Sequence, residues 1–139
     1  GMWKAFVEIK SMGWVNDPLP RMVAAQSTGC APVVKAFQER QRDTDFWENS
    51  DTVALGLNVP GPLGGAWILD ILRESKGIAI MIDEQRLKAL TEEFNNLTSI
   101  NSSDEGGVVW GAYSHLKKVG WIKPKERSVI FATGIERIK

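Results

Sequence analysis

Two short polar turns contain residue types that could bind a small ligand. The first is Ser27-Thr28-Gly29-Cys30, which follows an apolar run, and the second is Thr133-Gly134, which ends another. Small hydroxyl-bearing side chains and free backbone N–H groups can hydrogen-bond a ligand without the cost of burying a charge. Turns between strands and helices also use Ser, Thr and Gly for structural reasons, so the residues alone favour a structural role.

The other reactive residues favour structural roles as well. Cys30 lies near a predicted helix start, which lowers a thiol pKa, but a small buried hydrophobe is the favoured role. His115 is the single histidine, so neither a serine–histidine–aspartate set nor a metal site is indicated. Gly61–Gly65 could place a phosphate at a helix start, but it lacks the known phosphate-binding patterns and predicts a plain turn. Asp104 and Glu105 open a helix, where carboxylates offset the helix dipole.

Size and composition restrict the class of protein. The chain has 139 residues, 43% of them hydrophobic, which predicts one domain with its own core. The 17 basic and 17 acidic side chains balance, so nothing indicates nucleic acid or an anionic membrane as a partner. No apolar run approaches the roughly 20 residues of a membrane span. A single cysteine excludes an intramolecular disulfide and suits a cytoplasmic location.

Alternating strands and helices are predicted to position the two turns. Short apolar runs predict buried strands at 21–26, 78–82 and 128–133. Apolar residues three and four positions apart predict five helices. These begin near Trp3, Pro32, Ala66, Asp83 and Glu105. Residues 41–65 are polar and then rich in glycine and proline, which predicts a long irregular connection.

The order of these elements predicts the fold class. Strands separated by helices pair in parallel, with helices on both faces of the sheet. The expected fold is therefore α/β, with three layers and a mostly parallel sheet. Ligands in such folds bind beyond the carboxyl ends of the strands, where both polar turns lie. Without other information, the residues indicate an α/β domain whose ligand is unassigned.

A series of short motifs runs along nearly the whole chain. The most specific is Thr52–Pro60 (TVALGLNVP), followed closely by Pro62–Gly64. Others are Met2–Phe6, Arg21–Gln26, Gly29–Pro32, Lys35–Phe37, Ile68–Asp70, Arg73–Ser75, Glu105-Gly106, Gly120–Pro124 and Thr133-Gly134. In their order and spacing they resemble threonine synthase and its relatives among the fold-type-II pyridoxal-phosphate enzymes. The resemblance implies that residues 1–139 form a single α/β domain, the C-terminal fragment of a larger enzyme fold.

This resemblance implies a role for both polar turns. In such enzymes, the threonine of a Thr-Gly pair near the C-terminus hydrogen-bonds the pyridine nitrogen of the cofactor. Thr133 and Gly134 match that pair. The turn at Gly29 and Cys30 would line the edge of the same ring. The implied cofactor is pyridoxal phosphate, with weak or absent binding expected in this chain alone.

The residues that would perform the chemistry are missing from the matching region. The family's cofactor-binding lysine, its asparagine loop and its glycine-rich phosphate cradle lie upstream, and no lysine of this chain matches that position. No catalytic residue is therefore assigned, because the cofactor has neither a covalent anchor nor a resident base. Thr28 stands where relatives often have Glu, and Asp104 replaces a proline before Glu105. These departures indicate relaxed constraint around the site, or a divergent relative.

The favoured interpretation is the C-terminal portion of a threonine-synthase-like lyase that is inactive alone. The whole enzyme would convert O-phosphohomoserine to threonine, or carry out a related replacement or elimination. The alternative is a non-catalytic α/β domain that associates with a partner chain carrying the missing half. A third is an unrelated small-molecule-binding module. Without its packing partner the chain should expose apolar surface, so a homo-oligomer or a complementary N-terminal half is the expected partner.

Overall fold

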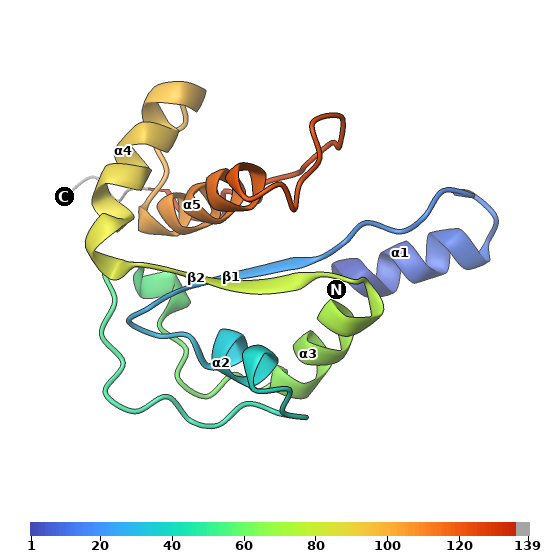
Figure 1. Ribbon diagram of the computed structural model, residues 1–139, viewed down its shortest axis with the longest axis horizontal. Coiled ribbons are helices and arrows are strands. Elements are labelled where there is room, and N and C mark those ends of the chain that lie inside the picture. The colour runs from blue at the N-terminus through green and yellow to red at the C-terminus, as the bar shows by residue number, and fades with distance from the viewer. Residues whose placement is uncertain (136–139) are drawn as a thin grey trace.

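The computed structural model describes residues 1–135 of the chain, in which helices and strands alternate (Figure 1). The α-helices are α1 (Met2–Ser11), α2 (Pro32–Gln38), α3 (Gly65–Glu74), α4 (Leu87–Thr98) and α5 (Asp104–Lys118). The strands are β1 (Val23–Ser27) and β2 (Ile78–Ile82), and two single 3₁₀ turns are η1 (Leu55–Leu57) and η2 (Glu84–Arg86). No helix within residues 1–135 is long and apolar enough to cross a membrane.

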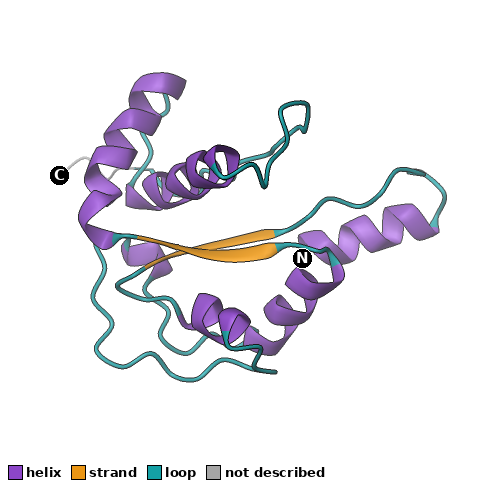
Figure 2. Ribbon diagram, in the orientation of Figure 1, coloured by secondary structure: helices purple, strands orange, loops and turns teal. Residues whose placement is uncertain are grey.

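The two strands form a parallel sheet between two layers of helices. Their register runs from Val23 opposite Ile78 to Ser27 opposite Ile82. Helices α2 and α3 lie on one face of the sheet, and α4 and α5 lie on the other (Figure 2). The predicted three-layer α/β class with parallel pairing is therefore confirmed.

Each face of the sheet has its own hydrophobic cluster, because successive side chains of a strand point to opposite faces. Ala79 belongs to the cluster with α2 and α3, while its neighbour Ile80 packs against the cluster with α4 and α5. The first cluster is Ala31, Val33, Val34, Ala36, Leu69, Leu72 and Ala79. The second is Ala54, Ile82, Leu87, Leu90, Val108 and Ala112. These clusters hold the helices that position both polar turns.

The predicted strand at 128–133 is wrong. Its residues lie outside the sheet, which contains only β1 and β2 within residues 1–135. The expected burial is absent too, because Val129 is 80% exposed and Phe131 is 52% exposed. A strand forms when a neighbouring strand pairs with its backbone, and no strand of the described residues lies beside this segment. The apolar sequence is present, but its pairing partner is not.

Candidate site at the carboxyl edge of the sheet

The carboxyl ends of β1 and β2 lie side by side because the strands are parallel and in register. The turn after β1 is bonded directly to the turn after β2. Thr28 donates its backbone N–H to the Ile82 carbonyl at 2.8 Å. Glu84 in turn donates its backbone N–H to the Thr28 hydroxyl at 2.9 Å. The first polar turn and the start of η2 therefore form one edge.

The Glu84 carboxylate lies at the centre of this edge. The buried Ser27 hydroxyl donates a hydrogen bond to it, and Val53 donates its backbone N–H at 2.6 Å. Burial acts to raise the pKa of Glu84, but the hydrogen bonds from Ser27 and Val53 outweigh it and hold the pKa below its usual value. Glu84 is therefore an ionised carboxylate that fixes the loop segment beginning at Val53.

A second carboxylate, Glu105 on the first turn of α5, holds the same loop segment. Gly56 donates its backbone N–H to Glu105 at 2.6 Å, and the Ser103 hydroxyl donates to the other carboxylate oxygen. Burial again acts to raise the pKa, and these hydrogen bonds lower it to a value below the ordinary range. Residues 53–56 are therefore held between two charged side chains from different elements.

The second polar turn joins this arrangement through the start of α5. The Gly134 carbonyl accepts hydrogen bonds from the Ser102 hydroxyl at 3.2 Å and from the Ser103 backbone N–H at 3.4 Å. Thr133 is exposed, and its hydroxyl makes no hydrogen bond to another residue of 1–135. The two turns that the sequence predicted as ligand-binding therefore lie on the same side of the fold, linked through residues 53–56.

The turn at Gly29 and Cys30 faces the protein interior. Cys30 is fully buried, and burial raises the pKa of its thiol, so it is an inert packing residue. The Gly29 carbonyl accepts hydrogen bonds from the Asp51 backbone N–H at 3.0 Å and from the Trp47 indole at 3.1 Å. The loop at 47–51 therefore covers this turn, and the turn supports the carboxyl edge of the sheet from the interior.

The residues that connect the site were not identified from the sequence as site residues. Glu105 was interpreted as a carboxylate that offsets the helix dipole and as part of a family motif, and Glu84 was not singled out. The signal available was the family-like stretch Thr52–Pro60, which has no regular secondary structure apart from η1. A conspicuous motif on an irregular loop needs partners elsewhere to hold it in place.

The described residues fit only one part of pyridoxal phosphate. The Thr133 hydroxyl is exposed and is available to hydrogen-bond a ligand. A phosphate has no obvious position, because the first N–H groups of α2, on Val33 and Val34, already donate to the Gln26 side chain at 3.0 and 3.1 Å. Every lysine within residues 1–135 is exposed, and the side-chain bonds of lysines in this part of the chain, Lys4 to Glu8 and Lys123 to the Gly120 carbonyl, lie away from this edge. Within residues 1–135 the lysines are therefore all exposed, and the first N–H groups of α2 are occupied by Gln26.

The glycine-rich segment before α3 does not supply the missing phosphate position. A Cβ atom on Gly65 would lie 2.4 Å from the Thr44 hydroxyl and 2.6 Å from an Asp43 carboxylate oxygen. The start of α3 is therefore packed against a polar, negatively charged loop that would repel a phosphate. This agrees with the prediction that Gly61–Gly65 is a plain turn.

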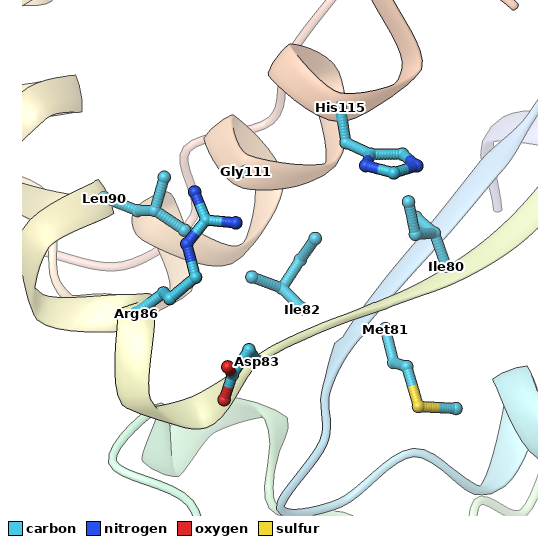
Figure 3. A pocket seen from close by; sticks show the side chains of 8 residues that line it. All are labelled: Ile80, Met81, Ile82, Asp83, Arg86, Leu90, Gly111 and His115. Atoms are coloured by element: carbon cyan, nitrogen blue, oxygen red, sulfur yellow. The ribbon is translucent and has the colours of Figure 1, made fainter. Parts of the chain in front are cut away.

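A cavity of about 250 Å³ lies beyond the candidate site, between β2, α4 and α5. Ile80, Ile82 and Leu90 contribute apolar side chains to it, and a Cβ atom on Gly111 of α5 would lie 2.8 Å from Leu90 and 3.1 Å from Ile82. Arg86 and His115 stand at its rim from different helices, while the Asp83 side chain points away (Figure 3). None of the predicted ligand-binding residues lines this cavity. Within the described residues, no group of three metal-binding side chains is present either.

Comparison with known proteins identifies the family. A model of the family described as "Pyridoxal-phosphate dependent enzyme" matches residues 1–134. Threonine synthase of Methanosarcina acetivorans is 28% identical over 133 residues, covering 96% of this chain and 33% of that protein. Threonine synthase of Methanocaldococcus jannaschii is 26% identical over 133 residues, again 96% of this chain and 33% of that protein.

A solved structure agrees with the fold. Maize serine racemase superposes with a TM-score of 0.62 at 14% sequence identity, covering 86% of this chain and 35% of that chain. The chain spans about a third of the length of the curated relatives it matches. The resemblance drawn from the sequence motifs is confirmed by the family match, which covers nearly all of the described residues. This chain belongs to the family of pyridoxal-phosphate-dependent enzymes.

Proposed function

We propose that this chain is the C-terminal portion of a threonine-synthase-like, pyridoxal-phosphate-dependent lyase. The whole enzyme would convert O-phosphohomoserine to threonine, or carry out a related replacement or elimination. The observation that carries the proposal is the pair of carboxylates, Glu84 and Glu105, which hold the most family-like segment of the chain. That segment joins the two polar turns at the edge where ligands of α/β folds bind.

Each residue of the two turns has a proposed part in binding the cofactor. Thr133 presents its hydroxyl to the pyridine nitrogen, and Gly134 fixes Thr133 in place through its carbonyl contacts with Ser102 and Ser103. Gly29 and Cys30 form the wall beside the ring through the shape of their turn, since Cys30 itself is buried. When bound, the cofactor supplies electron withdrawal from the substrate α-carbon.

The chain is proposed to be inactive until a complementary polypeptide supplies the remaining groups. A lysine that holds the cofactor, and a cradle for its phosphate, must come from outside residues 1–135. The activity of the complex separates this proposal from the non-catalytic alternative. Both predict association with a complementary half, but only the first predicts turnover by the complex.

An activity assay on the reconstituted complex tests the proposal. The chain is mixed with the lysine-bearing N-terminal part of the Methanosarcina acetivorans threonine synthase and with pyridoxal phosphate. Phosphate release and threonine formation from O-phosphohomoserine are then measured. We expect turnover by the mixture and none by either part alone.

Two variants of the chain show whether Thr133 takes part. Thr133→Val should lower kcat by about tenfold or more, because the ring nitrogen loses its partner, while Ser128→Ala should behave as the unchanged chain. A stable complex without turnover would favour the non-catalytic alternative. Equal turnover by Thr133→Val and the unchanged chain would contradict the proposed role of Thr133.

A further inference from the structure

The cavity between β2, α4 and α5 is built by one continuous part of the chain. Its volume is about 250 Å³, and all of its lining residues lie between positions 80 and 115. Pockets for drug-sized ligands usually have volumes of about 300–1,000 Å³, so this cavity suits a smaller molecule. Its lining includes neither Glu84 nor Glu105, and neither of the two polar turns. The cavity is therefore separate from the candidate site at the carboxyl edge.

The inner part of this cavity is apolar. Ile80, Ile82 and Leu90 line it, and the last two also belong to the hydrophobic cluster with α4 and α5. Gly111 of α5 lines the cavity as well, and it has no side chain that could fill the space. An aliphatic group that entered the cavity would leave water and contact these side chains, which is favourable.

Two side chains with N–H donors stand at the rim of the cavity. Arg86 extends from η2 and His115 extends from α5 (Figure 3). Within the described residues, neither side chain takes part in an ion pair or a hydrogen bond, and both are exposed. Exposed arginines are often bonded only to water, but Arg86 is distinguished by the apolar hollow beside it. The rim therefore offers donors to a group that is anchored in the hollow.

The one acidic residue of the cavity lining does not neutralise Arg86. The Asp83 carboxylate accepts the Gln85 backbone N–H at 3.1 Å, and its side chain points away from the cavity (Figure 3). A cationic ligand group at the rim would therefore meet the Arg86 charge without a carboxylate to pair with. An anionic group would be attracted to the same charge. The electrostatics of the rim favour an anion over a cation.

We propose that this cavity binds a short aliphatic carboxylate. A guanidinium group such as that of Arg86 pairs with a carboxylate through two parallel hydrogen bonds, and His115 can donate a further N–H. The aliphatic chain would lie against the apolar side chains of β2 and α4. An inorganic anion would use only the rim and an uncharged apolar molecule only the interior, whereas this class of ligand uses both. The inference goes beyond the proposed function, because no residue proposed to bind the cofactor lines the cavity.

An NMR titration of the isotope-labelled full chain with isocaproate tests the inference. This acid combines a carboxylate with a short branched chain. The backbone amides of Gly111 and Ile82 should shift saturably, with a Kd on the order of 1 mM or tighter. Isocaproamide has the same shape without the charge, so it should bind about tenfold more weakly or worse. Acetate has the charge without the branched chain, and its binding should be weaker by a similar factor.

Two variants of the rim separate its donors. Arg86→Gln should weaken isocaproate binding by about tenfold or more, because the charged pairing is lost. His115→Ala should weaken it by about threefold, as expected for one hydrogen bond. Both side chains are exposed, so the positions of amide signals far from the cavity should stay unchanged. Lys88→Gln is the matched control, because Lys88 is an exposed cation of α4 outside the cavity lining, and it should bind as the unchanged chain does.

Several outcomes would overturn the proposed ligand class. Without saturable shifts at Gly111 and Ile82, the cavity would not be a binding site for isocaproate. Equal binding of isocaproamide, or unchanged binding by Arg86→Gln, would remove the role of the charged pair. Equal binding of acetate would leave only an anion site, and tighter binding of leucine would indicate an amino acid instead. Isocaproate binding and turnover by the reconstituted complex are measured separately, so either can fail without the other.

Discussion

At the scale of single residues, the candidate site depends on two ionised carboxylates. Both carboxylates are partly buried. Glu84 accepts hydrogen bonds from the Val53 backbone N–H and the Ser27 hydroxyl. Glu105 accepts them from the Gly56 backbone N–H and the Ser103 hydroxyl. Hydrogen bonds to a charged acceptor are stronger than neutral ones, and losing one leaves a donor unpaired. The conformation of this loop is therefore set by side chains distant in the sequence.

Replacing Glu84 by Gln tests its contribution. The amide has no charge and accepts fewer hydrogen bonds, so the free energy of unfolding at pH 7 should fall by about 1–3 kcal/mol. Glu92→Gln, at an exposed position on α4, should change it by less than about 0.5 kcal/mol. Urea denaturation of the three proteins measures these differences.

The stability difference between the unchanged chain and Glu84→Gln is expected to depend on pH. Because the folded pKa of Glu84 lies below its unfolded value of about 4.3, its carboxylate stabilises the fold above that value. This stabilisation is lost as the pH falls through the folded pKa. The difference between the unchanged chain and Glu84→Gln should therefore be largest at neutral pH and shrink in acid. A difference that stays constant from pH 7 down to about pH 3 would show that ionisation is irrelevant.

Gly29 is predicted to be intolerant of any side chain. A Cβ atom there would lie 1.9 Å from the Asp51 carbonyl oxygen, which belongs to backbone and cannot rotate away. Gly29→Ala should lower the free energy of unfolding by about 1–3 kcal/mol through this clash. Gly64→Ala is the matched control, because no atom lies within 4 Å of its Cβ position. Thermal denaturation compares the two, and equal midpoints would contradict the packing described for the first turn.

At the scale of elements, sequence patterns predicted those parts of the fold that local composition determines. The run at 78–82 forms β2 with the predicted bounds, and the first strand begins two residues later and ends one residue later than the predicted 21–26. Residues 128–133 have a similar apolar composition but form no strand, because pairing needs a neighbour that composition does not reveal. The roles of Glu84 and Glu105 were likewise unpredictable, since they arise from contacts across long sequence separations.

The contact between Arg21 and Trp121 is predicted to hold the C-terminal segment in its path. Arg21→Ala removes the ring stacking together with the bonds to Glu126 and the Trp121 carbonyl, at a cost of about 1 kcal/mol. Arg21→Lys should rescue little of this, because an ammonium group lacks the planar fork. Tryptic cleavage at Arg127 should become faster in both variants. The exposed pair formed by Arg73 and Asp70 offers a control, since Arg73→Ala should leave that rate unchanged.

At the scale of the whole molecule, the fold has the form of an incomplete parallel sheet. Parallel sheets are normally covered on both faces and extend over several strands, whereas within residues 1–135 this one has two strands and an open edge on β1. The large exposed apolar side chains beside that edge, such as Trp67, agree with a missing neighbour. The chain therefore has part of the family fold, and we propose that Thr133 is the partner of the ring nitrogen while the anchoring groups lie elsewhere.

The most direct measurement is an absorbance titration of the chain alone with pyridoxal phosphate, followed by borohydride reduction and mass spectrometry. All lysines within residues 1–135 are exposed, and none lies at the candidate site. We therefore predict no stable absorbance band from a bound cofactor, and no modification concentrated at one lysine. A stoichiometric adduct at a single lysine would contradict this account, because it would show that the chain holds the cofactor covalently by itself.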